Sequence, residues 1–330
     1  MIELDIIALG AVTPVGLSAS QTALLLRAKV RPVHEVPFRD ALGESLGACF
    51  VPMFPDDMVG DERLVALAAP ALREVMTYPP VAQKLPLVLA VGHATDAMPR
   101  ELLETASAAG IDASAITVLR AGHAGFGYAL REAARRIEGG AVEVVVGAID
   151  SHCEPFSLRK LDEEFAVLSR RSPNGFVPSE AAIFIRVKKA GVHPASMATI
   201  KSVAIGVEET VKAGEPNLAA ALTELVHASS QGTPMRWLVS DVNGEPHRSR
   251  EVTLVETRCP EVIARDGEHL ALGCTLGDVG AASMGLATVL VSSLAHADVA
   301  PSLPALVIGA SETGERAVLV IDRGRPDATA

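Results

Sequence analysis

The sequence predicts an α/β protein whose largely parallel or mixed sheet is covered by helices on both faces. Short apolar runs typical of buried strands alternate with helical patterns along the chain, and this alternation is typical of sheets packed between helices. Hydrophobic residues make up 49% of the 330 residues and charged residues 21%, so the chain is long and apolar enough to form a large core. This composition excludes a disordered, collagen-like or coiled-coil protein.

The first half of the chain contains five expected strands and one clear helix. Between the third and fourth strands, residues 128–137 place Leu130, Ala133 and Ile137 at helical spacing, and Gly139 and Gly140 end this helix. The strands are expected from continuous apolar runs at residues 2–9, 85–91, 116–119, 142–149 and 181–187.

The second half repeats this order, which indicates a coarse duplication of the architecture. Strands are expected at 199–205, 235–239, 305–308 and 317–321, and helices at 218–228 and 281–293. Loops rich in proline and polar residues occur at 170–179 and 188–196. The second loop is the most plausible seam, so we predict two halves at residues 1–190 and 191–330.

The charge balance and the aromatic content restrict the possible partners. The chain has 29 Lys and Arg against 40 Asp and Glu, which gives a formal net charge of −11. An acidic chain without a basic run argues against nucleic acid and against an anionic membrane surface. Aromatic residues are only 3% of the chain, so stacking platforms for bases or sugars are not expected.

The cysteines and the N-terminus favour a reduced, cytoplasmic setting. The four cysteines, Cys49, Cys153, Cys259 and Cys274, are widely separated, so neither a disulfide framework nor a zinc motif is evident, and no metal site is expected. The first residues lack a basic segment before their apolar stretch, and we find no uninterrupted run of about 18 apolar residues.

Several segments, in the expected order, make the chain resemble the β-ketoacyl synthases of the thiolase superfamily. Near the C-terminus, GDVGAASMGLATVLV (277–291) is similar to their glycine- and alanine-rich helix entry, and ALVIGASETGERAVLVIDR resembles their closing hairpin. In the first half, the similar segments are GAVTPVG (10–16), EVVVGAIDS (143–151) and SPNGFVPSEAAIFIRV (172–187), the last being the most specific match.

This resemblance implies a thiolase-like five-layered α-β-α-β-α sandwich of two pseudo-repeated halves, usually paired as a homodimer across strands of the first half. It also implies acyl transfer followed by decarboxylative condensation, as in fatty acid and polyketide biosynthesis. In that family the acyl group is carried by a cysteine at a helix N-terminus, where the helix dipole and backbone amides activate the thiol and hold the oxyanion. Two histidines, or a histidine and an asparagine, assist the loss of carbon dioxide.

The chain departs from this pattern at all three catalytic positions. The nucleophile is expected at Gly122 or His123, and no cysteine lies there. In place of the two histidines, the segment SDVNGEPH (240–247) offers Asp241 or Asn243, and Asp278 follows Gly277. Without a thiolate there is no acyl-enzyme on sulfur. The chain therefore resembles short bacterial synthase-like proteins that lack the nucleophilic cysteine.

The candidate catalytic residues are His123, Asn243 and Asp278, because the resemblance implies that their three loops meet at one pocket. His123 could act as a general base, accept an acyl group or cap its turn. Asp278 could orient that imidazole or cap the following helix. The candidate ligand-binding residues are Gly122, Gly125 and Cys274, and Cys274 could equally be a small core residue.

Three further features have functional or structural interpretations. Glu180 matches a glutamate whose implied role is to bond loop backbone near the site. His93 follows a strand and could line the cavity or end that strand. A basic cluster could bind an acidic carrier protein or a phosphopantetheine phosphate, or be a solvated face. Its members are Arg159, Lys160, Arg170 and Arg171.

We therefore predict a β-ketoacyl synthase-like pseudoenzyme that binds an acyl group or acyl carrier, or that partners an active synthase as a homodimer or heterodimer. One alternative is an acyltransferase or thioester hydrolase that uses His123 with Asp278 or Asn243, and another is a scaffold protein. No cofactor is expected, although acyl-CoA or acyl-carrier phosphopantetheine is a possible ligand.

Overall fold

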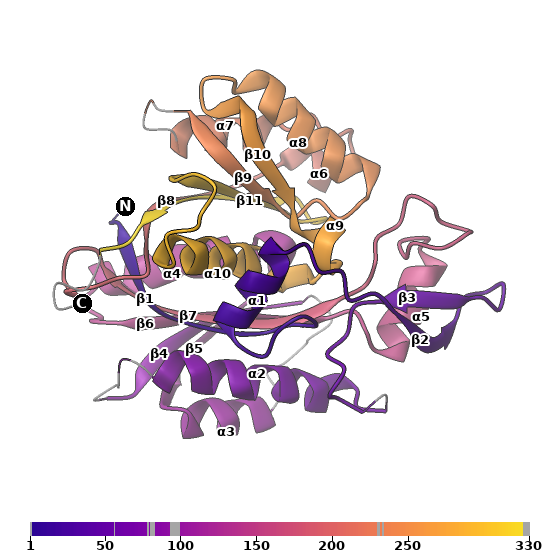
Figure 1. Cartoon of the computed structure of the whole chain (residues 1–330), viewed down its shortest axis with the longest axis horizontal. Helices are drawn as coiled ribbons and strands as arrows, with labels where there is room; N and C mark the ends of the chain where they lie inside the picture. Colours follow the sequence, from indigo (N-terminus) through magenta and orange to yellow (C-terminus); the bar gives the residue numbers. More distant parts are fainter. Residues whose placement is uncertain are drawn as a thin grey trace.

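The computed structural model describes residues 2–325 except 56, 78, 80–82, 93–99, 230–231 and 233. The predicted α/β class is confirmed, and Figure 1 shows five alternating layers of helices and strands. Helices α2 (Gly60–Thr77) and α3 (Arg100–Ala108) form one outer layer, and α7 (Ala220–Ser229) and α8 (Pro246–Arg258) form the other. Helices α4 (Gly125–Glu138) and α10 (Ser283–His296) lie between the two sheet layers.

The two halves of the sheet have the same strand order, which confirms the predicted duplication. The order is β5-β4-β6-β7-β1 in the first half and β10-β9-β11-β12-β8 in the second. The first-half strands are β1 (Leu4–Val12), β4 (Leu85–Val91), β5 (Ile111–Leu119), β6 (Val144–Ser151) and β7 (Glu180–Lys189). The second-half strands are β8 (Ala198–Val207), β9 (Met235–Ser240), β10 (Ile263–Ala271), β11 (Ala305–Ala310) and β12 (Glu315–Arg323).

The sheet is mixed, as the alternation of elements predicted. Strands β5, β4 and β6 are parallel, whereas β6, β7 and β1 are antiparallel neighbours, and the second half follows the same rule. The two halves are joined where Leu4–Ile6 of β1 pair antiparallel with Ala198–Ile200 of β8. The boundary at residues 190 and 191 stays a prediction, although it falls between β7 and β8.

The remaining elements are short connections around these layers. Strands β2 (His34–Arg39) and β3 (Ser45–Ala48) form a separate hairpin. Helices α1 (Ala19–Arg27), α5 (Pro155–Glu163), α6 (Glu209–Lys212) and α9 (Leu272–Leu276) complete the chain, with the 3₁₀ turns η1 (Gly122–Ala124) and η2 (Gly280–Ala282). Strand β10 was not predicted from sequence, because it is an edge strand whose central residues are mostly exposed and polar.

The middle helix layer contains the largest hydrophobic cluster. Helix α10 is apolar around nearly its whole circumference, and twelve of its 14 residues are buried, as expected for a helix covered by a sheet on both sides. Helix α4 approaches strand β12 so closely that a Cβ added at Gly127 would lie 2.4 Å from the Cβ of Ala317. A side chain larger than hydrogen does not fit between these two elements.

A valine at Gly127 is expected to lower the free energy of unfolding by about 1–3 kcal/mol, because the core must move apart to accept it. The matched control is Gly139→Val at the end of the same helix, where an added Cβ would be 3.4 Å from its nearest neighbours. Urea titrations followed by circular dichroism would measure both variants. Equal stability of the two variants would contradict this close packing.

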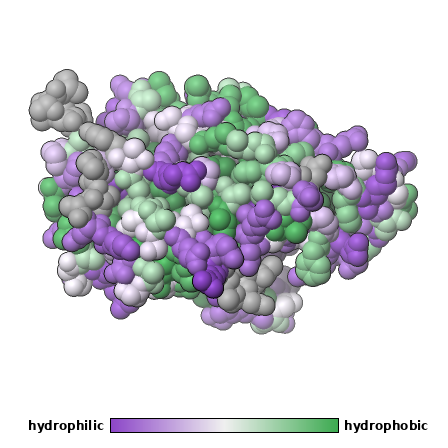
Figure 2. Space-filling model, turned by 90° about the horizontal axis from the view of Figure 1, so that it is seen from below, coloured by the Kyte–Doolittle hydropathy of each residue, from purple (hydrophilic) through white to green (hydrophobic). Residues whose placement is uncertain are grey.

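The face of the molecule that carries α2 and α3 has a mixed surface. Seen from the side of α2 and α3, hydrophilic and hydrophobic residues are interspersed (Figure 2), which is ordinary for a solvent-facing layer. Within the described ranges, no helix combines the length and the apolar character needed to span a bilayer.

Candidate functional site

The structure brings His123, Asn243 and Asp278 together. The Nε2 atom of His123 lies 2.8 and 2.9 Å from the two carboxylate oxygens of Asp278. The amide of Asn243 donates to Asp278 Oδ2 at 2.6 Å. The family resemblance implied that these loops converge, and their positions in the structure agree with it.

Two equivalent glycine turns form the floor of the site. Gly122 begins η1 with φ 48°, and Gly280 begins η2 with φ 52°, which is a conformation that favours glycine. A Cβ on Gly280 would be 2.1 Å from Asp150 Oδ2, and this carboxylate accepts the Ala281 N–H at 2.9 Å. The duplicated fold therefore places one glycine turn from each half at the same site.

Both ring nitrogens of His123 are hydrogen bonded. Nδ1 lies 3.2 Å from Nη2 of Arg248, and a guanidinium has only donors. Nδ1 must therefore be the acceptor, so we assign the proton to Nε2, which donates to Asp278. In this arrangement His123 is neutral, and its single lone pair is occupied by Arg248.

Asp278 fills both roles that the sequence left open. It orients His123, and it accepts the Gly280 N–H at 2.7 Å at the start of η2. Burial tends to raise the pKa of Asp278, but its interactions with His123, which donates a hydrogen bond to it, and with His152 hold that pKa well below its usual range. Asp278 is therefore a buried carboxylate.

Arg248 was not identified from the sequence, although it organises the site. Its side chain is 2% exposed and pairs with Asp241 at 3.1 Å, Glu245 at 3.2 Å and Glu312 at 2.5 Å. It lies in the first turn of α8, where the helix dipole disfavours a cation. That unfavourable placement is the signal in the sequence that could have indicated a buried role.

A cavity of about 430 Å³ opens beside these residues. Gly122, His123, Asp278 and Gly280 contribute to its wall, together with His152, Phe176 and Lys160 from α5. His152 lies 3.6 Å from Asp278, and its ring is tilted against Phe176 with centroids 5.9 Å apart. Burial lowers the pKa of His152, but Asp278 and the charge of Asp150 outweigh it and raise the pKa to about 9. His152 is therefore a cation at neutral pH.

The other predicted ligand residues lie elsewhere. Gly125 is in the first turn of α4 and packs toward Ala90 rather than the cavity. Cys274 lies on α9 and packs against the hydrophobic cluster of α7 and α8, so among the described residues it is not part of the cavity wall. His93 lies outside the described residues.

None of the four cysteines is an activated thiol beside His123. Burial raises the pKa of Cys49 to about 12, of Cys259 to about 11, and of Cys153 and Cys274 above the ordinary value. Cys153 lines a separate, smaller cavity with Arg63. A low pKa is what makes a cysteine nucleophilic, so these thiols have the opposite character.

The residues of the predicted basic cluster do not act together, because they make separate contacts. Arg170 pairs with Glu44 at 2.7 Å, and Arg171 pairs with Asp162 at 3.3 Å. Lys160 alone of the four contributes to the described cavity wall. Of this cluster, only Lys160 on α5 is therefore placed to contact a ligand in the described cavity.

We expect the stability of the protein to fall as the pH rises through about 9. Because folding raises the pKa of His152 from 6.5 to about 9, its contribution is complete below pH 6.5 and is lost above pH 9, and it amounts to roughly 3 kcal/mol. Asp278 acts in the opposite sense, since its contribution is lost as the pH falls through its lowered pKa. Urea titrations from pH 6 to 10 should show this loss in the wild type and a flatter profile in His152→Gln. Parallel profiles would rule out the ion pair.

No protein-family model and no curated protein matches the sequence. Solved ketosynthase structures do match it. The ishigamide ketosynthase/chain length factor is 20% identical with a TM-score of 0.72, covering 97% of this chain and 99% of that chain. A complex of a type II polyketide synthase acyl-carrier protein with its ketosynthase, bound to a hexaketide, matches at 14% identity and a TM-score of 0.80, covering 98% and 99%.

A modular enzyme extends the same likeness. The ketosynthase from module 6 of the bacillaene synthase of Bacillus subtilis 168 is 12% identical with a TM-score of 0.74, covering 98% of this chain and 72% of that chain. The chain therefore has the five-layered, thiolase-like ketosynthase fold that its motifs predicted. Since one fold supports several activities, the function must be inferred from the site residues.

Proposed function

We propose that this chain binds an acyl thioester presented by an acyl carrier, without forming an acyl-enzyme, and acts as a synthase partner. The observation that carries the proposal is the ring of His123, whose two nitrogens are held by Asp278 and Arg248. A general base needs a free lone pair within reach of the proton it takes. The neighbouring Gly122 offers only backbone at the same turn.

The cavity supports binding of an extended, partly polar ligand. Its wall combines the apolar side chains of Phe156, Leu161 and Phe176 with His152 and Lys160. A few polar groups in a mainly apolar cavity are typical of small-molecule sites. The cationic groups suit the phosphate of a phosphopantetheine arm.

Pairing with a second chain through β5 is part of the same proposal. Strand β5 is the outermost strand of the first-half sheet, and its residues are mostly only partly buried. An edge strand with free backbone groups can add another strand. Light scattering after size exclusion should give a dimer, either alone or with a synthase.

Binding can be measured with a non-hydrolysable acyl-pantetheine and with an acylated carrier protein. We expect both to raise the melting temperature and to bind in calorimetry. Ala166→Trp fills the cavity and should abolish binding, whereas Ala213→Trp on an exposed site should not. If neither ligand binds the wild type, the chain is a scaffold rather than an acyl-binding protein.

Thioester hydrolysis is the alternative that the His123–Asp278 pair favours, because the carboxylate orients the imidazole as in base-assisted hydrolysis. It requires Arg248 to release Nδ1. Steady thiol release that disappears in His123→Ala would establish hydrolysis in place of simple binding.

A further inference from the structure

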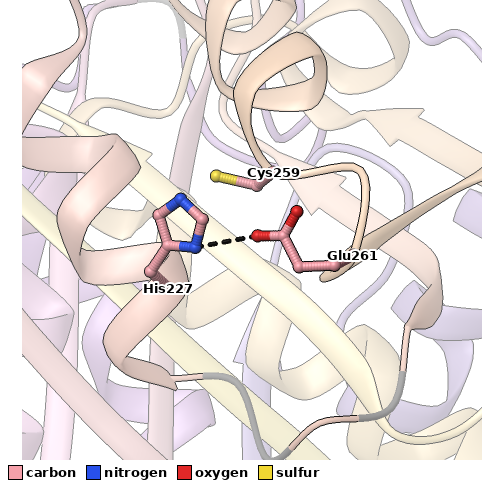
Figure 3. Close-up of side chains that lie close together, drawn as sticks. All are labelled: His227, Cys259 and Glu261. Carbon is pink, nitrogen blue, oxygen red and sulfur yellow. Dashed lines mark ion pairs between the residues drawn. The ribbon is translucent and has the colours of Figure 1, made fainter.

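We propose that His227, Cys259 and Glu261 form a zinc site in the outer layer made by α7 and α8. One ligand atom from each residue lies within 4.8 Å of the other two. Figure 3 shows the thiol of Cys259 beside the imidazole of His227, with the carboxylate of Glu261 facing the same ring. None of these three residues is among those that line the His123 cavity.

The three donor atoms are those that zinc prefers. Zinc binds imidazole nitrogen, thiolate sulfur and carboxylate oxygen at about 2.0–2.3 Å in tetrahedral geometry, so its ligand atoms lie about 3.3–3.8 Å apart. His227 Nδ1 and Glu261 Oε1 are already 2.9 Å apart. Small side-chain rotations would therefore complete a three-ligand site, and a water would take the fourth position.

The backbone holds two of the ligands in a fixed turn. Cys259 caps the C-terminus of α8, and its carbonyl accepts the N–H groups of Val262 and Ile263 at 3.0 and 2.9 Å. Pro260 between the ligands restricts the backbone further. The backbone positions of Cys259 and Glu261 are thus fixed in the metal-free protein.

The electrostatics of the two helices favour a cation. His227 is in the last turn of α7, and Cys259 ends α8, so both helices direct their negative C-terminal ends toward the site. The cation Arg258 extends to the carbonyl of Leu218, which precedes α7 and lies at its opposite end. With a thiolate, a carboxylate and a neutral imidazole, the bound zinc would be charge-neutral.

The thiol can be converted to a ligand without an additional reactant. Its contact with the Thr223 carbonyl is long, at 3.8 Å, so little is lost when it is broken. On binding, the S–H proton goes to solvent and the sulfur lone pair forms the Zn–S bond. His227 and Glu261 are 47% and 57% exposed, so a metal can enter between them.

A second group of possible metal ligands is less suited to a cation than the first. Glu245, His247 and Glu312 also place one ligand atom each within 4.8 Å. Both of its carboxylates are paired with Arg248, at 3.2 and 2.5 Å. A divalent cation there would be repelled by the guanidinium, so this cluster serves as the control.

The test is titration of the full chain with Zn²⁺ and, as a spectroscopic probe, with Co²⁺. We expect one equivalent to bind, with a thiolate-to-cobalt charge-transfer band and a rise in melting temperature with zinc. His227→Gln, an exposed change that leaves the core intact, should weaken binding at least about tenfold. Cys259→Ser should remove the charge-transfer band.

The controls are His247→Gln in the second cluster and Cys274→Ser, and both should bind zinc as the wild type does. The proposal is overturned if the wild type binds no zinc, or if binding survives His227→Gln but is lost in His247→Gln. A cobalt band that persists in Cys259→Ser and disappears in Cys274→Ser would also overturn it. These outcomes are independent of acyl binding, so they do not depend on the proposed function.

Discussion

Replacing Arg248 with alanine is expected to lower the free energy of unfolding by about 3–5 kcal/mol. The guanidinium is 2% exposed and pairs with Asp241, Glu245 and Glu312, and Asp241 is itself buried. Removing the cation leaves a buried carboxylate without a counter-charge, which is among the costliest single changes in a protein. Urea denaturation at pH 7 measures the effect.

The matched control for Arg248→Ala is Arg250→Ala, an exposed arginine on the same helix, which should change stability by no more than about 0.5 kcal/mol. Arg248→Lys should lie between the two, because lysine keeps the charge but lacks the planar fork that reaches several acceptors. If Arg248→Ala proves as stable as Arg250→Ala, the guanidinium does not hold the site together.

Glu180→Ala is expected to destabilise the protein by a similar amount, about 3–5 kcal/mol. Its fully buried carboxylate accepts two hydrogen bonds from Arg63, at 2.6 and 2.7 Å, and one each from the Val51 N–H and the Ser151 hydroxyl at 2.8 Å. The truncation leaves the buried Arg63 without the carboxylate that balances its charge. These contacts agree with the role in bonding loop backbone that the resemblance implied.

Glu163→Ala, at an exposed position of α5, is the control for Glu180→Ala. Differential scanning calorimetry should show a large decrease in melting temperature for Glu180→Ala and almost none for Glu163→Ala. The double variant Arg63→Met with Glu180→Leu should recover part of the loss, because it removes both charges together. A double variant as unstable as the sum of its parts would contradict that explanation.

The buried strands could be predicted from sequence because they are short apolar runs, and β4 coincides with its predicted range of 85–91. The outer helices were less evident. Helix α8 has arginine and glutamate on its buried side, including Arg248 and Glu251. Apolar periodicity therefore misses it, since buried ion pairs replace apolar contacts there.

The candidate site was predictable where a motif specified a loop, and not where it depended on partners distant in the sequence. The resemblance brought His123, Asn243 and Asp278 together, and the structure agrees. The contacts of Arg248 and His152 with these residues depend on the folded chain. The sequence could mark Arg248 only as an unusual cation at a helix start, without indicating its partners. Cys274 was placed near the site because it is close to Asp278 in sequence, but its helix turns it toward the outer layer.

The arrangement of His123 has one main chemical consequence. A neutral imidazole fixed between a carboxylate and a guanidinium binds and orients, but it neither accepts an acyl group nor takes a proton while those contacts last. The thiols have raised pKa values and lie away from the ring. The proposed function therefore assigns no acyl-carrying role to His123 or to these thiols.

The most direct measurement is the intact mass of the full chain after incubation with acetyl- and malonyl-thioesters, with a cysteine-containing ketosynthase as the positive control. We predict that the control gains one acyl group while this chain keeps its unmodified mass and releases no carbon dioxide. An adduct of one acyl group per chain that maps to His123 or to a cysteine would contradict the account.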